Sequence, residues 1–172
     1  MIKDFTARLW KLGDDIDTDI IIPTEYLAFP TVEEMKGYAF SPLRPELAGQ
    51  IEKGDIIVAG KNFGCGSSRE QAPEVIKALG VRCIIAKSYA RIFFRNAINN
   101  GLLVMENATL SDCVKEGDVI EVAVGDCVMA GCETFPLASL PQNLLDILEA
   151  GGLVRAMQKL NGIDGRTGGE EA

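Results

Sequence analysis

The chain has 172 residues, 47% of them hydrophobic, and a formal net charge of -8. These values predict a globular protein with a substantial core and exclude a disordered chain, and the acidic balance argues against a nucleic-acid partner. No apolar stretch approaches the roughly 20 residues that cross a bilayer, and the N-terminus lacks the pattern of a signal peptide. We therefore expect a cytoplasmic protein that does not enter membranes.

The first fifty residues predict one strand followed by irregular structure. Residues 6–12 alternate polar and apolar side chains and predict a strand, and an acidic turn follows at residues 13–19. The apolar run at residues 20–22 predicts a second, short strand that ends at Pro23. Residues 24–50 are rich in proline and predict a long loop with one helical turn at residues 32–36. Loops of this length often form lids or specificity segments.

The middle of the chain alternates strand and helix patterns. We expect strands at 55–59, 82–86 and 102–105, and helices at 68–79 and 89–99. This β-α-β-α-β order predicts parallel strands that are covered by helices, with right-handed crossovers.

The last third of the chain has a different pattern. It predicts a strand at 119–124, a second β segment at about 126–137, and a helix from Pro141 that Gly151 and Gly152 divide. We expect a folded domain over residues 1–160 and a flexible C-terminal tail at residues 161–172, which is rich in glycine and polar residues.

Cysteine and histidine usage limits the possible chemistry. The chain has no histidine and no C-x-x-C pair, and its five cysteines are unevenly spaced: Cys65, Cys83, Cys113, Cys127 and Cys132. This argues for reduced thiols and against a metal site built by this chain alone. Because histidine is the commonest general base, any acid–base chemistry needs another base or residues from a second chain. Asp15, Asp17 and Asp19 resemble a cation loop, but capping and bracing of the turn is the simpler interpretation.

The stretch from Gly60 to Gln71 is the strongest functional signal. A glycine-rich turn between a strand and a helix presents Ser67, Ser68 and Arg69 near a helix N-terminus, where free N–H groups and the helix dipole favour anions. Alternatively, the serines cap the helix: Ser67 with Glu70, or Ser68 with Gln71, fits the pattern of a capping box. In a nucleotide-binding P-loop the lysine follows the glycines, whereas Lys61 precedes Gly64 and Gly66, so the stretch is not a P-loop.

Three phrases together resemble the small-subunit family of isopropylmalate dehydratases in the aconitase superfamily. They are Gly13-Asp-Asp-Ile-Asp-Thr-Asp-Ile-Ile-Ile-Pro23, Asn62-Phe-Gly-Cys-Gly-Ser-Ser-Arg-Glu-Gln71 and Ala86-Lys-Ser-Tyr-Ala-Arg-Ile-Phe-Phe-Arg-Asn96. The resemblance implies an α/β fold, a three-layer swivelling β/β/α domain like the C-terminal domain of aconitases. It also implies that this chain binds no cofactor and that a separate large subunit carries a [4Fe–4S] cluster.

The resemblance also implies roles for the glycine-loop residues. Ser67 corresponds to the catalytic base, Arg69 to the residue that binds a substrate carboxylate, and Ser68 to a substrate-binding or loop-shaping residue. The reaction is a reversible dehydration and rehydration of a 2-hydroxy dicarboxylic acid through an alkene. The partner's cluster would serve as a Lewis acid for the leaving hydroxyl.

Substrate choice is expected to depend on a loop whose residues are Tyr26, Leu27, Ala28, Phe29, Pro30 and Thr31. Relatives that act on tricarboxylates place an arginine here, whereas this chain has none between Thr24 and Leu43. An apolar surface favours an isopropyl group over a third carboxylate. This favours 3-isopropylmalate and leucine biosynthesis. Other branched dicarboxylates, 2,3-dimethylmalate or 2-methylmalate, would fit the same pocket, and a tricarboxylate such as homoaconitate is an alternative if Lys36 or Arg44 reaches the substrate.

A different class of function also fits the sequence. A stand-alone anion-binding module would use the glycine loop without a partner, and the isolated chain could associate with itself. Four residues have no assigned role from the sequence: Cys65, Lys87, Arg91 and Arg95.

Overall fold

A mixed β-sheet organises the chain in the computed structural model, which describes residues 2–162. Within that range the strand order is β4-β3-β2-β1-β5-β6-β7. The strands are β1 (Phe5–Lys11), β2 (Ile56–Ala59), β3 (Cys83–Ala86), β4 (Leu103–Glu106), β5 (Val119–Ala123), β6 (Cys127–Ala130) and β7 (Glu133–Pro136).

Helices connect and cover these strands. Their bounds are α1 (Thr18–Ile21), η1 (Thr24–Ala28), α2 (Val32–Met35), η2 (Lys36–Tyr38), α3 (Leu47–Gln50), α4 (Gln71–Ala78), α5 (Arg91–Asn99), α6 (Leu110–Cys113), α7 (Gln142–Ala150) and α8 (Leu153–Leu160). None of these helices combines the length and the apolar character that crossing a membrane requires.

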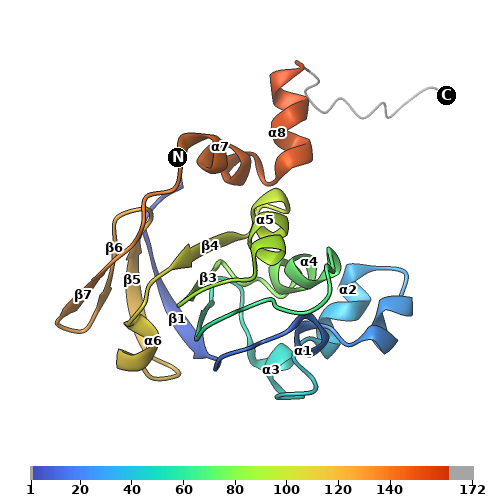
Figure 1. Cartoon of the computed structure of the whole chain (residues 1–172), viewed down its shortest axis with the longest axis horizontal. Helices are drawn as coiled ribbons and strands as arrows, with labels where there is room; N and C mark the ends of the chain where they lie inside the picture. The colour runs from blue at the N-terminus through green and yellow to red at the C-terminus, as the bar shows by residue number, and fades with distance from the viewer. Residues whose placement is uncertain (1, 163–172) are drawn as a thin grey trace.

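Strand β1 joins two halves of the sheet. Its end pairs parallel to β2, with Leu9 opposite Ile56, and its beginning pairs antiparallel to β5, with Phe5 opposite Val122. The parallel half continues through β3 and β4, and the antiparallel half through β6 and β7. Figure 1 shows these halves as two layers, with α4 and α5 beyond the parallel strands. The predicted α/β class with β/β/α layers is therefore confirmed.

The two halves of the sheet differ in how they are buried. All four residues of β2 and all four of β3 are buried, as expected for parallel strands that are covered on both faces. Strand β5 alternates exposed and buried positions, which is typical of an antiparallel strand with one face in water. The parallel half therefore provides the rigid platform on which the loops after β1, β2 and β3 are carried.

A buried carboxylate fixes the start of β2 against β1. Asp55 is 6% exposed and accepts hydrogen bonds from Arg8 Nη2 at 2.6 Å, Trp10 Nε1 at 2.8 Å and the Glu52 amide at 2.9 Å. Burial alone would raise the pKa of Asp55, but these hydrogen bonds, with that from Arg8 the strongest, hold the pKa below its ordinary value. The ionised carboxylate therefore ties together the two strands that lead into the candidate site.

The prediction of a strand at residues 20–22 was wrong. The segment is helical (α1), and Asp17 caps it by accepting a hydrogen bond from the Ile20 amide at 2.8 Å. An N-terminal cap outweighs the β preference of three isoleucines because the run is short and Pro23 stops it from extending. Residues 24–50 form several short helices rather than a loop with one turn, although the predicted turn at residues 32–36 matches α2.

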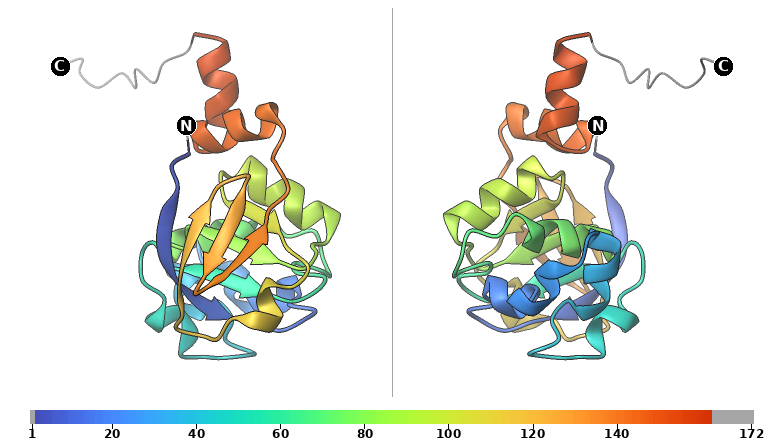
Figure 2. Two further views of the ribbon diagram at one scale, coloured as in Figure 1. Left: turned by 90° about the vertical axis from the view of Figure 1, so that its left-hand side faces the viewer. Right: turned by 90° about the vertical axis from the view of Figure 1, so that its right-hand side faces the viewer.

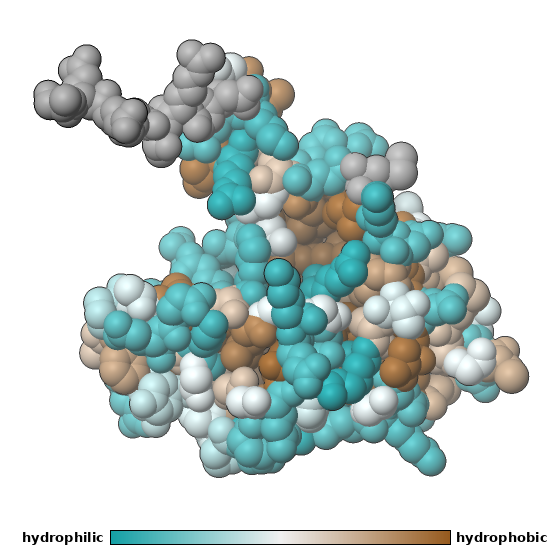
Figure 3. Space-filling view, turned by 180° about the vertical axis from the view of Figure 1, so that it is seen from behind, coloured by the Kyte–Doolittle hydropathy of each residue, from teal (hydrophilic) through white to brown (hydrophobic). Residues whose placement is uncertain are grey.

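The C-terminal helix is divided as predicted. Gly151 and Gly152 have φ of +84° and +128°, and a Cβ on Gly152 would lie 2.8 Å from the Asn99 carbonyl oxygen. Helix α8 then projects from the body, and Leu160 on it is 82% exposed (Figures 1 and 2). Seen from behind, apolar surface gathers in a hollow below this helix (Figure 3). Of the predicted tail, residues 163–172 lie outside the described residues.

Candidate active site

The glycine loop, α1 and the start of α5 enclose a cavity of about 320 Å³. Its lining brings Ser67, Ser68 and Arg69 together, as the sequence predicts. The other lining residues are Thr18, Gly64, Gly66, Ala90, Arg91, Ile92, Phe93 and Asn96. The cavity is thus built from the three phrases that the sequence singled out.

Backbone hydrogen bonds hold the glycine loop between its two neighbours. On one side, the Gly64 amide donates to Ile16 O at 2.7 Å. On the other side, the Ala90 amide donates to Phe63 O at 3.0 Å, directly before α5 begins. The side chain of Thr18, which is 2% exposed, donates from Oγ1 to Ser67 O at 3.0 Å. The carbonyl group of the candidate base is therefore fixed by the acidic turn.

Gly64 is required for the close approach of the loop to α5. Its φ is +77°, and a Cβ added there would lie 2.1 Å from Phe93 Cγ. Only glycine combines this backbone conformation with this lack of a side chain. Phe93 is itself 3% exposed and packs edge-on against Phe63, so it belongs to the core.

The hydroxyl groups of Ser67 and Ser68 are exposed and form no hydrogen bond with residues 2–162. Both capping-box predictions were wrong: α4 begins at Gln71, and its N-cap residue, Glu70, has helical dihedral angles and no side-chain cap. The loop turns instead through a hydrogen bond from the Arg69 amide to Ser67 O at 2.8 Å. The hydroxyls are consequently free for a ligand.

Backbone donors lie beside these hydroxyls. The amides of Gly66, Ser67 and Ser68 donate to no group within the described range. Successive unpaired N–H groups in a turn form a concave surface that attracts anions. The loop can therefore stabilise negative charge on or near a serine oxygen without any metal from this chain.

Arg69 is anchored inside the chain. Its guanidinium donates from Nη1 to Ile22 O at 2.9 Å and from Nη2 to Thr24 Oγ1 at 2.7 Å. Nη2 also pairs with Asp19 at 2.5 Å, and the Arg69 side chain is only 14% exposed. Three of its five N–H groups are thus occupied, and the two that remain are one on Nε and one on Nη1. The anchoring fixes the position of the positive charge.

The predicted specificity loop does not line the serine cavity. Tyr26 and Phe29 stack with Tyr38, with ring centroids 4.1 Å apart for Tyr26–Tyr38 and 5.4 Å apart for Phe29–Tyr38. The link between this segment and the cavity is Thr24, the first residue of η1, whose hydroxyl accepts from Arg69. Within the described chain the loop therefore borders the site through Arg69.

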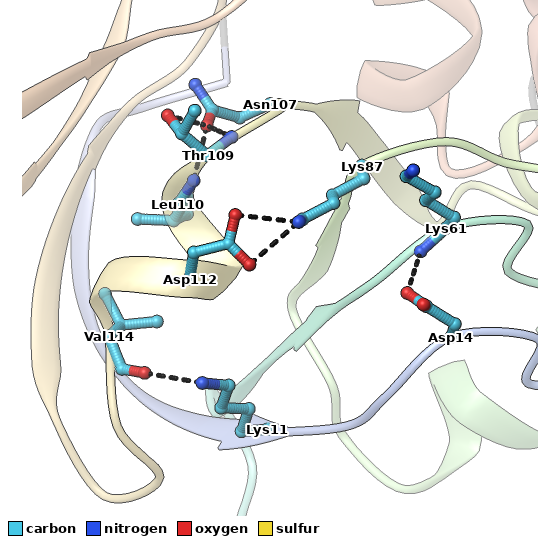
Figure 4. Close-up of polar contacts among 9 residues, drawn as sticks. All are labelled: Lys11, Asp14, Lys61, Lys87, Asn107, Thr109, Leu110, Asp112 and Val114. Atoms are coloured by element: carbon cyan, nitrogen blue, oxygen red, sulfur yellow. Dashed lines mark hydrogen bonds and ion pairs between the residues drawn. The ribbon is translucent and has the colours of Figure 1, made fainter.

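Lys87 and Lys61, which follow strands β3 and β2, make contacts that stabilise the fold. Lys87 Nζ binds both carboxylate oxygens of Asp112 on α6, at 2.7 and 2.8 Å (Figure 4). The Lys61 amide donates to Asp14 at 2.7 Å, which fixes the beginning of the glycine loop to the acidic turn. These contacts explain Lys87 as a structural residue and support the bracing role of the acidic turn.

The thiol beside the serines shows no sign of reactivity. Burial, and then the charges of Asp17 and Asp15, raise the pKa of Cys65 above its ordinary value. The thiol is therefore protonated at neutral pH and a poor nucleophile. Residues 2–162 contain no cluster of three or more histidine, cysteine or carboxylate side chains that could hold a metal ion.

Sequence reasoning missed three contributors to the site: Thr18, Asp19 and Asn96. Thr18 and Asn96 line the cavity, and Asp19 pairs with Arg69. The sequence contains a signal for Thr18 and Asp19, because Asp17-Thr-Asp before an apolar run is typical of a helix N-terminus. Asn96 belongs to the third phrase that the sequence singled out, but only the packing of α5 against the glycine loop places it in the lining of the cavity.

Comparisons with known proteins agree with this geometry. Residues 45–109 match the family model of the aconitase C-terminal domain. The 3-isopropylmalate dehydratase small subunit of Lachnospira eligens is 73% identical over 164 residues, which cover 95% of this chain and all of that protein. The homoaconitase small subunit of Thermus thermophilus is 47% identical over 154 residues, covering 88% of this chain and 94% of that protein.

A solved structure shares the fold. The crystal structure of the 3-isopropylmalate dehydratase of Methanocaldococcus jannaschii superposes with a TM-score of 0.87 at 40% identity, covering 93% of this chain and 96% of that one. Fold and serine loop together define a swivel domain of the aconitase type. Within that class, the chain belongs to the family of 3-isopropylmalate dehydratase small subunits.

Proposed function

We propose that this chain is the small subunit of a hydro-lyase that interconverts 2-isopropylmalate and 3-isopropylmalate in leucine biosynthesis. The observation that carries the proposal is the free Ser67 hydroxyl, which lies on a cavity with Arg69 and beside unpaired backbone amides. The 73% identity to an isopropylmalate dehydratase small subunit supports this substrate over the tricarboxylate of the less similar homoaconitase subunit.

Ser67 is the proposed base. In dehydration the Ser67 oxygen takes a proton from the substrate carbon next to the one that carries the hydroxyl. The electron pair of that C–H bond forms the double bond, and the hydroxyl leaves with its bonding electrons as hydroxide, which a Lewis acid on the second chain would hold. In rehydration Ser67 gives its proton to the carbon that lost the hydroxyl, and hydroxide adds to the carbon that lost the proton. A serine oxygen is a poor base unless its anion is stabilised, and the unpaired amides of Gly66, Ser67 and Ser68 supply that stabilisation.

Arg69 and Ser68 are proposed to hold the substrate. An unoccupied N–H group of Arg69 can donate a charge-assisted hydrogen bond to a carboxylate, and Arg69 and the exposed Ser68 hydroxyl line the same cavity. The aromatic segment that contains Tyr26 and Phe29 is proposed to set the allowed size of the substrate side chain through its contact with Arg69.

A second chain is proposed to complete the site. The described residues offer no ligand set for an iron–sulfur cluster, so the residues present do not fit that group. The resemblance assigns the cluster to a large subunit, and the relatives' description as small subunits supports such a partner. We expect the complex to be cytoplasmic.

The test is Ser67→Ala in a complex reconstituted with the large subunit. Loss of the base should lower kcat by about 10²–10⁴-fold, while gel filtration shows an unchanged complex. Ser68→Ala is the matched control, and we expect it to raise KM more than it lowers kcat. Near-normal turnover by Ser67→Ala would refute the assignment of the base. Tight dicarboxylate binding by the isolated chain, without any activity in the complex, would favour a stand-alone binding module.

A further inference from the structure

A second guanidinium borders the serine cavity at the start of α5. Arg91 is the first residue of this helix, and its side chain is exposed. It lines the serine cavity together with Ser67, Ser68 and Arg69, and it also lines a neighbouring apolar groove. Throughout residues 2–162 it forms no hydrogen bond or ion pair. Its charge is therefore available to a ligand.

The charges that line the cavity differ from those of the chain as a whole. The lining of the cavity includes two cations, Arg69 and Arg91, and no aspartate or glutamate among the described residues. The chain as a whole carries a formal charge of -8, and of these two cations Arg69 is paired with Asp19. The lining therefore offers one cation that is paired with an acid, Arg69, and one cation without such a partner in the described chain, Arg91, and the unpaired charge attracts an anion.

The fold fixes the backbone of α5 at Arg91 relative to the glycine loop. The amide of Ala90, the preceding residue, donates to Phe63 O at 3.0 Å, and the Phe94 amide closes the first helical turn on Ala90 O at 3.0 Å. Phe93 packs where a Cβ of Gly64 would otherwise lie. The start of α5 therefore cannot shift relative to the glycine loop without breaking backbone hydrogen bonds and buried packing.

We propose that Arg91 is a substrate-binding residue that takes the second carboxylate of the dicarboxylate whose first carboxylate binds Arg69. This inference rests on the proposed function of the Ser67 site. Two guanidiniums from different elements bind two carboxylates and leave the carbons between them facing Ser67. The positive end of the α5 dipole adds to the attraction at Arg91. Requiring two charges also discriminates against monocarboxylates.

The experiment compares Arg91→Gln with Arg95→Gln in the reconstituted complex, using 3-isopropylmalate. Loss of a charge-assisted contact should raise KM by roughly 10- to 100-fold, with a much smaller change in kcat. Arg95 is the matched control because it lies one turn further along α5, is exposed, and lines a neighbouring apolar groove but not the serine cavity. Its variant should keep KM within twofold of the original. Arg91→Lys, which keeps the charge but not the planar fork, should recover part of the loss.

Several outcomes would overturn the inference. Equal KM values for the two glutamine variants, or weaker subunit assembly at an unchanged KM, would make Arg91 a surface or interface residue. A fall in kcat alone would make it a group that acts on the base rather than on substrate binding. If Ser67→Ala is inactive and Arg91→Gln binds normally, only this inference fails. If Ser67→Ala is active, the proposed function fails first.

Discussion

Two loops at the same edge of the sheet differ in how they are held. The glycine loop, residues 60–71, is fixed by backbone hydrogen bonds to its neighbours and by the packing of Gly64 against Phe93. The aromatic segment, residues 24–38, is held by side-chain packing: Tyr26, Phe29 and Tyr38 stack on one another, and Met35 is buried in the core. A hydrogen bond from Arg69 to Thr24 connects the two loops.

This difference suits the two loops to different roles: the glycine loop positions the proposed base, and the aromatic segment is proposed to select the substrate. A base must be placed accurately with respect to its proton, so it benefits from a loop that cannot move without breaking the core. The aromatic segment has exposed positions, such as Ala28, whose side chains can change without disturbing that loop. Substrate range can therefore change while Ser67 stays in place.

The largest effect is expected when the fixed loop is broken. Gly64→Ala forces a Cβ to within 2.1 Å of Phe93 Cγ at a φ of +77°, which should lower the free energy of unfolding by about 2–5 kcal/mol. Urea denaturation of the chain measures this change. Gly13→Ala, at a glycine of the adjoining turn with no atom within 4 Å of the added Cβ, should change stability by less than about 0.5 kcal/mol. Equal losses for the two variants would contradict the packing argument.

A change of substrate preference should follow from the aromatic segment. Ala28 is exposed at the end of η1, and Ala28→Arg adds a cation that suits a third carboxylate. We expect kcat/KM for 3-isopropylmalate to fall by about tenfold, equivalent to about 1.4 kcal/mol, while activity toward homoaconitate-type acids rises. Ala28→Gln adds a similar side chain without the charge and should not raise the tricarboxylate activity. If the two activities move together in Ala28→Arg, the loop does not select the substrate.

The smallest effect concerns the rings themselves. Tyr38 is 41% exposed and stacks on Tyr26, so Tyr38→Leu should cost about 0.5–1.5 kcal/mol of stability. Thermal unfolding measures the loss, and Tyr38→Phe, which keeps the ring, should show little of it. Turnover of 3-isopropylmalate should stay within about threefold, because the glycine loop is not touched. A collapse of kcat would show that the two loops are not independent.

Much of the fold was predictable because its signals are local. The buried runs of β2, β3 and β4 and the glycine after each intervening helix identify the parallel half. The short helix α1 was missed because its cap, Asp17, competes with three β-branched residues over one turn of chain. The start of α4 was placed too early because serines before a helix resemble caps whether or not the backbone brings their oxygens to the amides.

The sequence by itself determined the chemistry that the site can offer: the serines, Arg69 and the glycines that shape the loop occur together in one short phrase, and the chain has no histidine to serve as a base. Only the tertiary structure decided which groups share the cavity. In the folded chain Arg69 pairs with Asp19, and Lys87 pairs with Asp112. The aromatic segment does not line the cavity, whereas Arg91 lines it with Ser67 and has no ion-pair partner among the described residues. The physical reason is that pairing of charges depends on distances across the fold, which the order of residues along the chain does not set.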